Sequence, residues 1–322
     1  MLLREKINRM NWIIEENTEE SIINLLSKEL NVDPIISSML VNRGIKSFEQ
    51  AKDFFRPNLN QLHDPFLMKD MDIAVSRIVS AIENKESIMV YGDYDVDGTT
   101  AVALLTSYLK ETGGIVSTYI PDRISEGYGI SLKAIDTASN NNQGLIIALD
   151  CGIKANAQVA YASSKGIDFI ICDHHNPSKL IPDALAILNP KRSDCNYPFK
   201  DLCGCGVGFK LIQAINLKKG FDIDRIVNYL DLVSLAIAAD IVPLVAENRT
   251  LAHIGMQIIN SNPRMGLHCI LKNNVKKEFN IGDLMFYVAP RINAAGRISH
   301  ASLSLELLMA VSYTHLTLPT KA

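Results

Sequence analysis

The stretch that decides the fold is SIMVYGDYDVDGTTAVALL, residues 87–105. Its first half contains a short continuous apolar run, Ile88–Tyr91, which predicts a buried strand, and its alanine-containing second half predicts a helix. Between them stand three aspartates at alternate positions, Asp93, Asp95 and Asp97. Burying three like charges in one turn is unfavourable unless a cation neutralises them. The stretch therefore predicts a metal-binding turn at the end of a strand.

The composition is that of an ordinary globular protein. The chain has 322 residues, of which 48% are hydrophobic and 21% charged, enough for two domains or one large domain with appendages. The net charge of −3 does not indicate a nucleic-acid-binding protein. Residues 249–300 nevertheless hold seven Lys or Arg against two acidic residues. That stretch could face a polyanion or be a solvated helical face.

The sequence contains no sign of a membrane span, a signal peptide or a disulfide framework. No apolar run approaches the roughly 20 residues of a membrane span, and the charged start does not suit a signal peptide. We therefore expect a soluble, cytoplasmic protein with no membrane association. The six cysteines lack a second pair at zinc-ligand spacing, so we expect reduced packing residues; they are Cys151, Cys172, Cys195, Cys203, Cys205 and Cys269.

The spacing of apolar residues divides the chain into four parts. Residues 1–82 are predicted to be helical and to pack on the core, and residues 246–311 to form a helical extension. Residues 312–322 depart from the helical pattern and are expected to be a non-native tail. In residues 83–245 strands and helices alternate, which predicts an α/β domain with a parallel sheet covered by helices on both faces. The predicted strands are Ile88–Tyr91, Ile115–Ile120, Leu145–Leu149, Phe169–Cys172 and Leu185–Leu188.

Ligands of such sheets bind beyond the carboxyl ends of the strands. Polar residues fall at that kind of position after four apolar segments: the Asp93, Asp95 and Asp97 turn, Asp150, the triplet Asp173-His174-His175, and Asp240 after Leu232–Ala239. We expect these side chains to meet at one edge of the sheet.

Carboxylates and an imidazole suit Mn²⁺ or Mg²⁺ better than a thiolate-binding metal. Two such ions about 3.5–4 Å apart can activate a water and stabilise the leaving oxygen of a phosphoester. Asp150 is predicted to bridge the two ions, with Asp95 on one of them, and the second ion is assigned Asp97, His174 and Asp240. Three neighbours are predicted to act in catalysis by orienting these ligands or polarising the water or phosphate: Asp93, Asp173 and His175.

Other interpretations of these residues are open. Asp93 to Gly98 matches the start of an EF-hand calcium loop, but that loop needs a preceding helix and a glutamate at its twelfth position, where Leu104 stands. Asp150 alone could cap a helix, and His174 alone could be a structural histidine.

The motifs resemble those of the DHH phosphoesterase family, named for the triplet at residues 173–175. YGDYDVDGTTA (residues 91–101) and CDHH (172–175) carry this resemblance. PDRISEGYG (121–129), GVGFKL (206–211) and PRINAAGR (290–297) favour its RecJ branch of single-stranded-DNA-specific exonucleases. The resemblance implies a two-ion Mn²⁺ or Mg²⁺ nuclease of DNA repair and recombination that releases mononucleotides from 5′ ends. Single-strand-binding protein or a helicase would be its partners.

The same resemblance makes Asp95, Asp97, Asp150, His174 and Asp240 the metal ligands. It implies phosphate contacts for Arg123, Arg291, Asn293 and Arg297, and the guanidinium groups of the three arginines suit phosphate oxygens. A surface salt bridge with Glu126 or Asp122 is the alternative for Arg123.

The chain departs from the family pattern at two places. Tyr91-Gly92 stands where some members carry a histidine before the first aspartate. RecJ-like proteins also continue into a second domain with a glycine-rich phosphate-binding motif and often an OB-fold, and neither is found in this sequence. Two other functions remain open: a phosphodiesterase for short oligonucleotides, cyclic dinucleotides or phosphoadenosine phosphate, and a catalytically weak nucleic-acid-binding member of the family.

Overall fold

The structure, a computed structural model, describes residues 19–123, 125–272, 276–298 and 302–310. The chain forms two compact units, Met1–Arg56 and Pro57–Ala322. The boundary lies at residue 56 rather than at residue 82, because helix α4 (Met71–Glu83) packs on β5 and α8 of the second unit. The tail proposed at residues 312–322 lies outside the described residues.

The first unit contains three short helices, α1 (Glu20–Leu30), α2 (Pro34–Val41) and α3 (Phe48–Phe55). Asp33 caps α2 and is followed by Pro34, and the Ser47 hydroxyl accepts a hydrogen bond from the third residue of α3. The helices enclose a small apolar core made of Ile23, Leu26, Leu40, Val41, Ile45 and Ala51. The predicted helical character of this region is confirmed.

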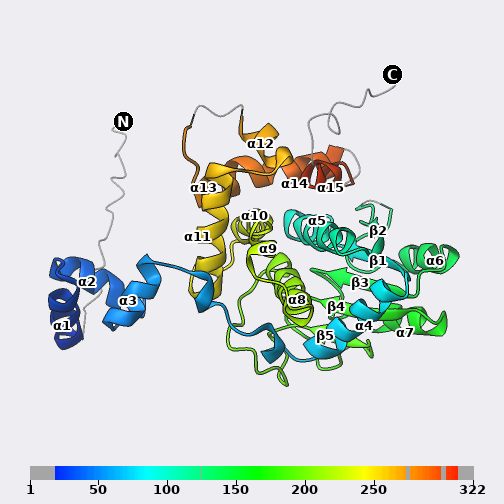
Figure 1. The fold of residues 1–322 in the computed structure, drawn as a ribbon, viewed down its shortest axis with the longest axis horizontal. Helices are drawn as coiled ribbons and strands as arrows, with labels where there is room; N and C mark the ends of the chain where they lie inside the picture. Colours follow the sequence, from blue (N-terminus) through cyan, green and yellow to red (C-terminus); the bar gives the residue numbers. More distant parts are fainter. Residues whose placement is uncertain (1–18, 124, 273–275, 299–301, 311–322) are drawn as a thin grey trace, which may run out of the picture. The chain divides into compact units, whose positions relative to one another are not determined.

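The second unit is built on a five-stranded parallel sheet in the order β2-β1-β3-β4-β5 (Figure 1). The strands are β1 (Ser87–Gly92), β2 (Ile115–Tyr119), β3 (Leu145–Leu149), β4 (Asp168–Cys172) and β5 (Ala186–Leu188). Each predicted strand is present. Leu149 pairs with Gly92 on one side and Cys172 on the other, so β1, β3 and β4 end level with one another. Residues that follow these strands therefore lie along one edge.

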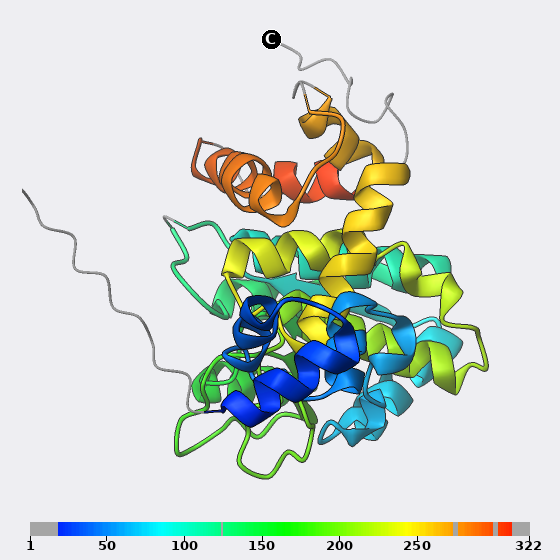
Figure 2. The same ribbon diagram turned by 90° about the vertical axis from the view of Figure 1, so that its left-hand side faces the viewer.

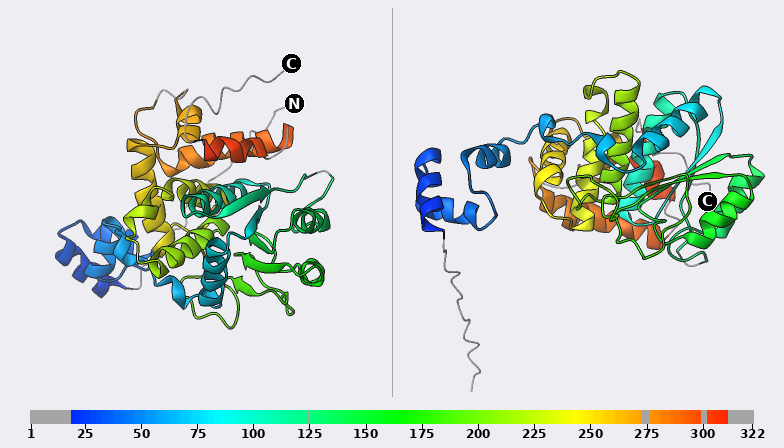
Figure 3. Two further views of the ribbon diagram at one scale, coloured as in Figure 1. Left: turned by 45° about the vertical axis from the view of Figure 1, so that its right-hand side comes forward. Right: turned by 90° about the horizontal axis from the view of Figure 1, so that it is seen from below.

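Helices cover both faces of the sheet, as predicted (Figure 3). On β1, Ile88 and Val90 share a core with α5 (Val96–Glu111) and α8 (Gly204–Lys218). Met89 and Tyr91 share another core with α6 (Leu132–Asn140) and α7 (Asn156–Ser164). This alternation is the period of two of a strand buried on both sides. The α/β fold class is confirmed.

The apolar run at residues 232–239 lies in a helix, α10 (Leu230–Asp240), and not in a strand. This helix is buried all round between α5, α8 and α11 (Ala246–Ser261), so its sequence shows no apolar stripe. The helical extension includes α12 (Met265–Leu271), α13 (Ile281–Asp283), the π-helix η3 (Leu284–Val288), α14 (Ala289–Ile298) and α15 (Ser302–Met309). In it, α14 and α15 pack on α5, and α14 also contacts α10 (Figure 2).

Short helices complete the unit: η1 (Leu59–Gln61), η2 (Pro65–Leu67) and α9 (Asp224–Val227). Within the described ranges, no helix combines the length and the apolar character that crossing a membrane requires. All six cysteines are free, and the five that are buried belong to the apolar cores, as expected of packing residues.

A buried ion pair joins α8 to α11 and provides a test of the fold. Lys210 Nζ lies 3.0 Å from Glu247 Oε1 and also donates to the carbonyl of His63, while the Tyr197 hydroxyl donates to Glu247 Oε2 at 2.6 Å. Glu247→Ala leaves the ammonium buried and unpaired, so we expect it to lower the free energy of unfolding by about 3–5 kcal/mol. Urea unfolding of both proteins measures this.

The control for that experiment is Lys133→Ala, which removes a lysine whose side chain is 70% exposed and whose Nζ lies 3.7 Å from Glu126 Oε1. Surface pairs contribute little because water screens them, so this variant should unfold with the parent chain. Equal midpoints for Glu247→Ala and Lys133→Ala would contradict the stabilising role of the buried pair.

Candidate metal centre

The turn after β1 packs three aspartates into the start of α5. Asp95 is the N-cap of this helix, and its Oδ1 accepts a hydrogen bond from Gly98 N at 2.9 Å. A Cβ at Gly98 would lie 2.5 Å from the carbonyl oxygen of Asp93, so the turn requires glycine there. A strand precedes the turn and α5 begins at Val96, which excludes an EF-hand.

Four side chains from distant parts of the sequence converge at this edge. His174 Nε2 lies 3.1 Å from Asp150 Oδ1, 3.7 Å from Asp97 Oδ2 and 3.7 Å from Asp240 Oδ2. Asp240 reaches the edge from the carboxyl end of α10. The predicted meeting of these residues at one edge is confirmed, although a helix rather than a strand delivers the last one.

The ligand atoms fall into three groups, and within each group they lie within 4.8 Å of one another. The groups are Asp93, Asp95 and Asp150; Asp97, His174 and Asp240; and Asp150, His174 and His175. Asp150 and His174 each belong to two of them, so the three groups overlap at these two side chains and form one continuous cluster. Asp93 and His175, which we expected beside the ligands, also lie at ligand-like distances. The individual roles of these residues remain predictions.

The first turn of α8 holds Asp97 in place. Gly204 N donates to Asp97 Oδ2 at 2.6 Å, and Cys205 N donates to Asp97 Oδ1 at 2.7 Å. Since Asp97 precedes these donors by more than 100 residues, the sequence spacing gives no sign of the contact. The glycine in the run CGCG, residues 203–206, is the one local sign that another group approaches the backbone closely there. Backbone donors at a helix start favour the anionic form of the carboxylate.

Two residues at this edge have left-handed backbone conformations. Asp150 has φ 60° and Ile241, directly after Asp240, has φ 56°. This region is unfavourable for a β-branched residue such as Ile241, and such strain concentrates at functional sites. Asp150 Oδ1 is buried and accepts no hydrogen bond from the part of the chain that the structure describes. The surroundings of Asp150 therefore suit the binding of a cation.

The carboxylates repel one another in a buried environment. Burial and then the charge of Asp95 raise the pKa of Asp93 to about 6, and burial and then Asp240 raise the pKa of Asp97 to about 8. Burial and Asp97 also raise the pKa of Asp150 well above its usual value, and burial and Asp95 raise that of Asp240 to about 6. A divalent cation among these groups would reverse the effect, and the donor set fits Mn²⁺ or Mg²⁺.

Asp173 orients the histidine beside the cluster. Its Oδ1 accepts from the backbone of His174 and His175 at 2.7 and 3.0 Å, and it lies 2.7 Å from His175 Nδ1. Burial alone would raise the pKa of Asp173, but the hydrogen bond from His175 and the backbone donors lower it. The same hydrogen bond raises the pKa of His175. The other ring nitrogen, Nε2, lies 3.4 Å from the Tyr128 hydroxyl, a contact that the sequence did not reveal.

The predicted phosphate-binding residues lie on two segments. Arg123 is exposed and lies over the ring of Tyr94, 5.0 Å from its centroid, while Glu126 accepts from the Tyr119 hydroxyl. On α14, Arg291 donates to the carbonyl of Tyr287 and lies over its ring, Asn293 is half-buried, and the side chain of Arg297 is outside the described residues. These four residues remain predicted phosphate contacts.

Gly204 allows a direct test of how the cluster is assembled. A Cβ at this position would lie 2.5 Å from Asp150 Cβ and 2.6 Å from Asp150 Oδ1. Gly204→Ala should therefore displace Asp150 and weaken Mn²⁺ binding about 10–100-fold, as loss of an outer-shell partner of a metal ligand does. Titration with Mn²⁺, followed by the electron paramagnetic resonance signal of the free ion, measures the affinity.

The matched control is Gly206→Ala on the same turn, where the nearest neighbours of a Cβ are 3.5 Å away. It adds the same methyl group to the same helix without meeting Asp150, so Mn²⁺ affinity should be unchanged. Equal affinities for the two variants would show that Gly204 does not position Asp150.

The sequence is similar to proteins that carry the same family name as its motifs suggested. A family model described as the DHH family, N-terminal domain, matches residues 87–237. The chain is 38% identical over 305 residues to the single-stranded-DNA-specific exonuclease RecJ of Bacillus subtilis (strain 168), covering 94% of this chain and 38% of that protein. The RecJ of Escherichia coli (strain K12) is 33% identical over 289 residues, covering 86% and 49%. The chain thus spans less than half the length of these two curated relatives.

Solved structures give the same fold. An exonuclease RecJ bound to manganese has 30% identity and a TM-score of 0.72, covering 80% of this chain and 64% of that chain. RecJ from Thermus thermophilus in complex with Mn²⁺ has 27% identity and a TM-score of 0.78, covering 92% and 42%.

Proposed function

The chain belongs to the DHH family, as its motifs indicated, and from this premise we propose that it hydrolyses phosphodiester bonds at the 5′ ends of single-stranded DNA. The observation that carries the proposal is the convergence of Asp97, Asp150, His174 and Asp240 at one sheet edge. The names of its relatives support the substrate class. A helicase or single-strand-binding protein that presents such an end is the kind of partner that the proposal implies.

Two divalent cations, Mn²⁺ or Mg²⁺, would be held by the groups around Asp150. When bound, they would lower the pKa of a water and neutralise charge on the scissile phosphate. Asp150 would contribute to both cations, with Asp95 completing one site and the remaining predicted ligands, Asp97, His174 and Asp240, completing the other. The buried Oδ1 of Asp150, which accepts no hydrogen bond from the described residues and lies 3.1 Å from His174 Nε2, is the atom that best fits this role.

The remaining residues of the centre act on the substrate. Asp173 accepts the Nδ1 proton of His175, which directs Nε2 away from Asp173 and towards the Tyr128 hydroxyl. Because the pKa of His175 is raised, its imidazolium is available to donate from Nε2 to a phosphate oxygen. Arg123 adds a fixed positive charge beside Tyr94, where the strand would approach.

The test is an assay with differently labelled substrates. A single strand labelled at its 5′ end should release labelled mononucleotide at once in the presence of Mn²⁺, whereas a 3′ label should stay in shortening strands. Blunt duplex should react slowly. Hydrolysis of dinucleotides but not of long strands would identify a small-nucleotide phosphodiesterase. Binding of Mn²⁺ without any hydrolysis would identify a binding member of the family.

A further inference from the structure

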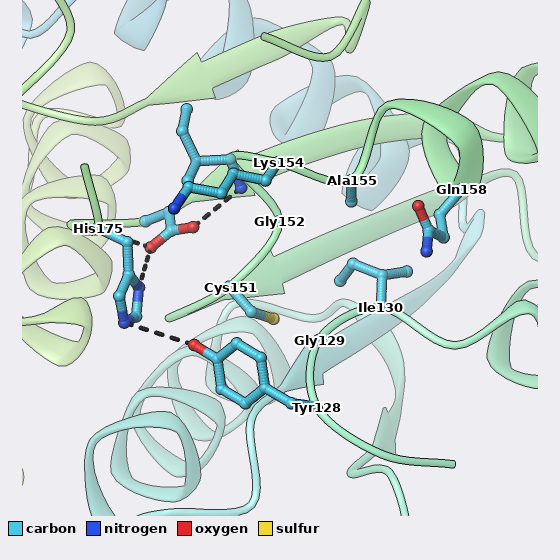
Figure 4. Close-up of a pocket in the computed structure, with 11 residues that line it drawn as sticks. Tyr128, Gly129, Ile130, Cys151, Gly152, Lys154, Ala155, Gln158 and His175 are labelled. Carbon is cyan, nitrogen blue, oxygen red and sulfur yellow. Dashed lines mark hydrogen bonds and ion pairs between the residues drawn. The ribbon is translucent and has the colours of Figure 1, made fainter. Parts of the chain in front are cut away.

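A cavity of about 270 Å³ opens beside His175 (Figure 4), a residue whose ring lies within 4.8 Å of ligand atoms of Asp150 and His174. Its lining comes from Asp173 and His175 after β4, from the loop between β3 and α7, from Gln158 of α7 and from residues 128–130. Pockets for drug-sized ligands occupy roughly 300–1,000 Å³, so this cavity suits a single nucleoside rather than an oligonucleotide. None of the five predicted metal ligands lines this space.

The lining combines apolar faces with polar ends. Ile130 and Ile153 supply buried apolar surface, Gln158 stands at one end, and Tyr128 and His175 stand at the other, as Figure 4 shows for the residues that it labels. A nucleobase has matching properties, because it has two apolar faces and an edge of hydrogen-bonding groups. The amide of Gln158 offers both a donor and an acceptor, so it can face any of the four bases.

His175 connects the cavity to the reacting groups. It lines the cavity, and it also lies within 4.8 Å of ligand atoms of Asp150 and His174. A phosphate held at the metal centre therefore has its attached nucleoside within reach of the cavity. Tyr128, whose ring meets the rings of both His175 and Tyr94 edge to face, adds an aromatic surface at the mouth.

We propose that this cavity binds the 5′-terminal nucleoside of the strand, so that the enzyme holds the unit that it releases. This inference rests on the proposed function. Because each turnover removes one nucleotide, a cavity for one nucleoside beside the scissile phosphate places the next phosphodiester bond at the metals after each cut. The cavity would accept any of the four bases, so it would give no sequence specificity.

The first test uses the unmodified chain. Strands with a normal 5′-terminal nucleotide should be hydrolysed about 5–100-fold faster, in kcat/KM, than strands whose terminal nucleotide lacks its base, as the energy of one base contact implies. Calorimetry in the presence of Mn²⁺ should likewise show tighter binding of dAMP than of deoxyribose 5-phosphate. This second measurement does not depend on turnover.

The second test fills the cavity. Gln158→Trp should remove both preferences, while Ala157→Trp, which places the same side chain at the neighbouring exposed position of α7, should keep them. Thermal melts verify that both variants fold. No hydrolysis of any strand would reject the proposed function, and the calorimetry would then decide about the cavity. If neither the rate of hydrolysis nor the binding affinity depended on the terminal base, the proposal that the cavity binds the nucleoside would be rejected and the proposed function would stand.

Discussion

Replacing Asp150 by asparagine should abolish Mn²⁺ binding and hydrolysis and at the same time stabilise the metal-free protein. The carboxylate is 2% exposed, one of its oxygens accepts no hydrogen bond from the described residues, and the nearby charges of Asp97 and Asp95 oppose its ionisation. Removing this charge removes the repulsion, so unfolding in EDTA should require more denaturant. Activity should fall by more than the roughly 10–100-fold that follows loss of an outer-shell partner.

Asparagine is preferred to alanine for this test because of the backbone. Asp150 has φ 60°, a conformation that asparagine adopts readily and alanine does not. The asparagine side chain would also keep the volume between His174 and Gly204 filled. A stability change can then be assigned to the charge rather than to strain or to a cavity.

The control for this experiment is Asp183→Asn, which makes the same chemical change at an exposed position. It should alter neither Mn²⁺ affinity nor stability beyond experimental error. Isothermal titration with Mn²⁺ and urea unfolding in EDTA provide the two readings. If Asp150→Asn bound Mn²⁺ with the parent's stoichiometry and affinity, the bridging role of Asp150 would be wrong.

The sequence predicts those residues of the metal centre whose positions depend only on the strand that precedes them. Each aspartate or histidine directly after β1, β3 or β4 could be placed at the edge, because parallel strands in level register bring their carboxyl ends together. The triplet at residues 173–175 and the turn at residues 93–97 needed no long-range information.

Asp240 shows where local pattern fails. The run before it is apolar on all sides, and a short run of that kind fits a buried strand and a buried helix equally well. Only the packing of α10 between α5, α8 and α11 decides for the helix. The contact of Gly204 with Asp97 and the contact of Tyr128 with His175 were missed for the same reason, since both arise from tertiary packing of segments far apart in the sequence.

The pH dependence of stability should distinguish the metal-free centre from the loaded one. In EDTA, the free energy of unfolding should fall as the pH rises from about 4 to about 8. Asp93 and Asp240 have pKa values of about 6 and Asp97 has one of about 8, whereas aspartates in an unfolded chain titrate near 3.9. In this window the folded protein binds more protons than the unfolded chain, so stability decreases with pH. For Asp93 alone the decrease is about 3 kcal/mol.

The other shifted groups do not cancel this trend. The raised pKa of His175 acts in the same direction, because its stabilising proton is lost as the pH rises. His174, whose pKa burial lowers to about 4, acts in the opposite direction between pH 4 and pH 6.5, but it is one group against several carboxylates. The lowered pKa of Asp173 has its effect below pH 4, outside the window.

Saturating Mn²⁺ should reverse the slope, because a bound cation takes the place of the protons and gains affinity as the carboxylates ionise. The difference in free energy of unfolding between Mn²⁺ and EDTA should therefore widen from pH 5 to pH 8. Asp93→Asn should flatten the EDTA curve, since it removes one of the titrating groups, whereas Asp183→Asn should leave it unchanged. A free energy of unfolding in EDTA that stays level or rises over this range would mean that these carboxylates do not share one buried site.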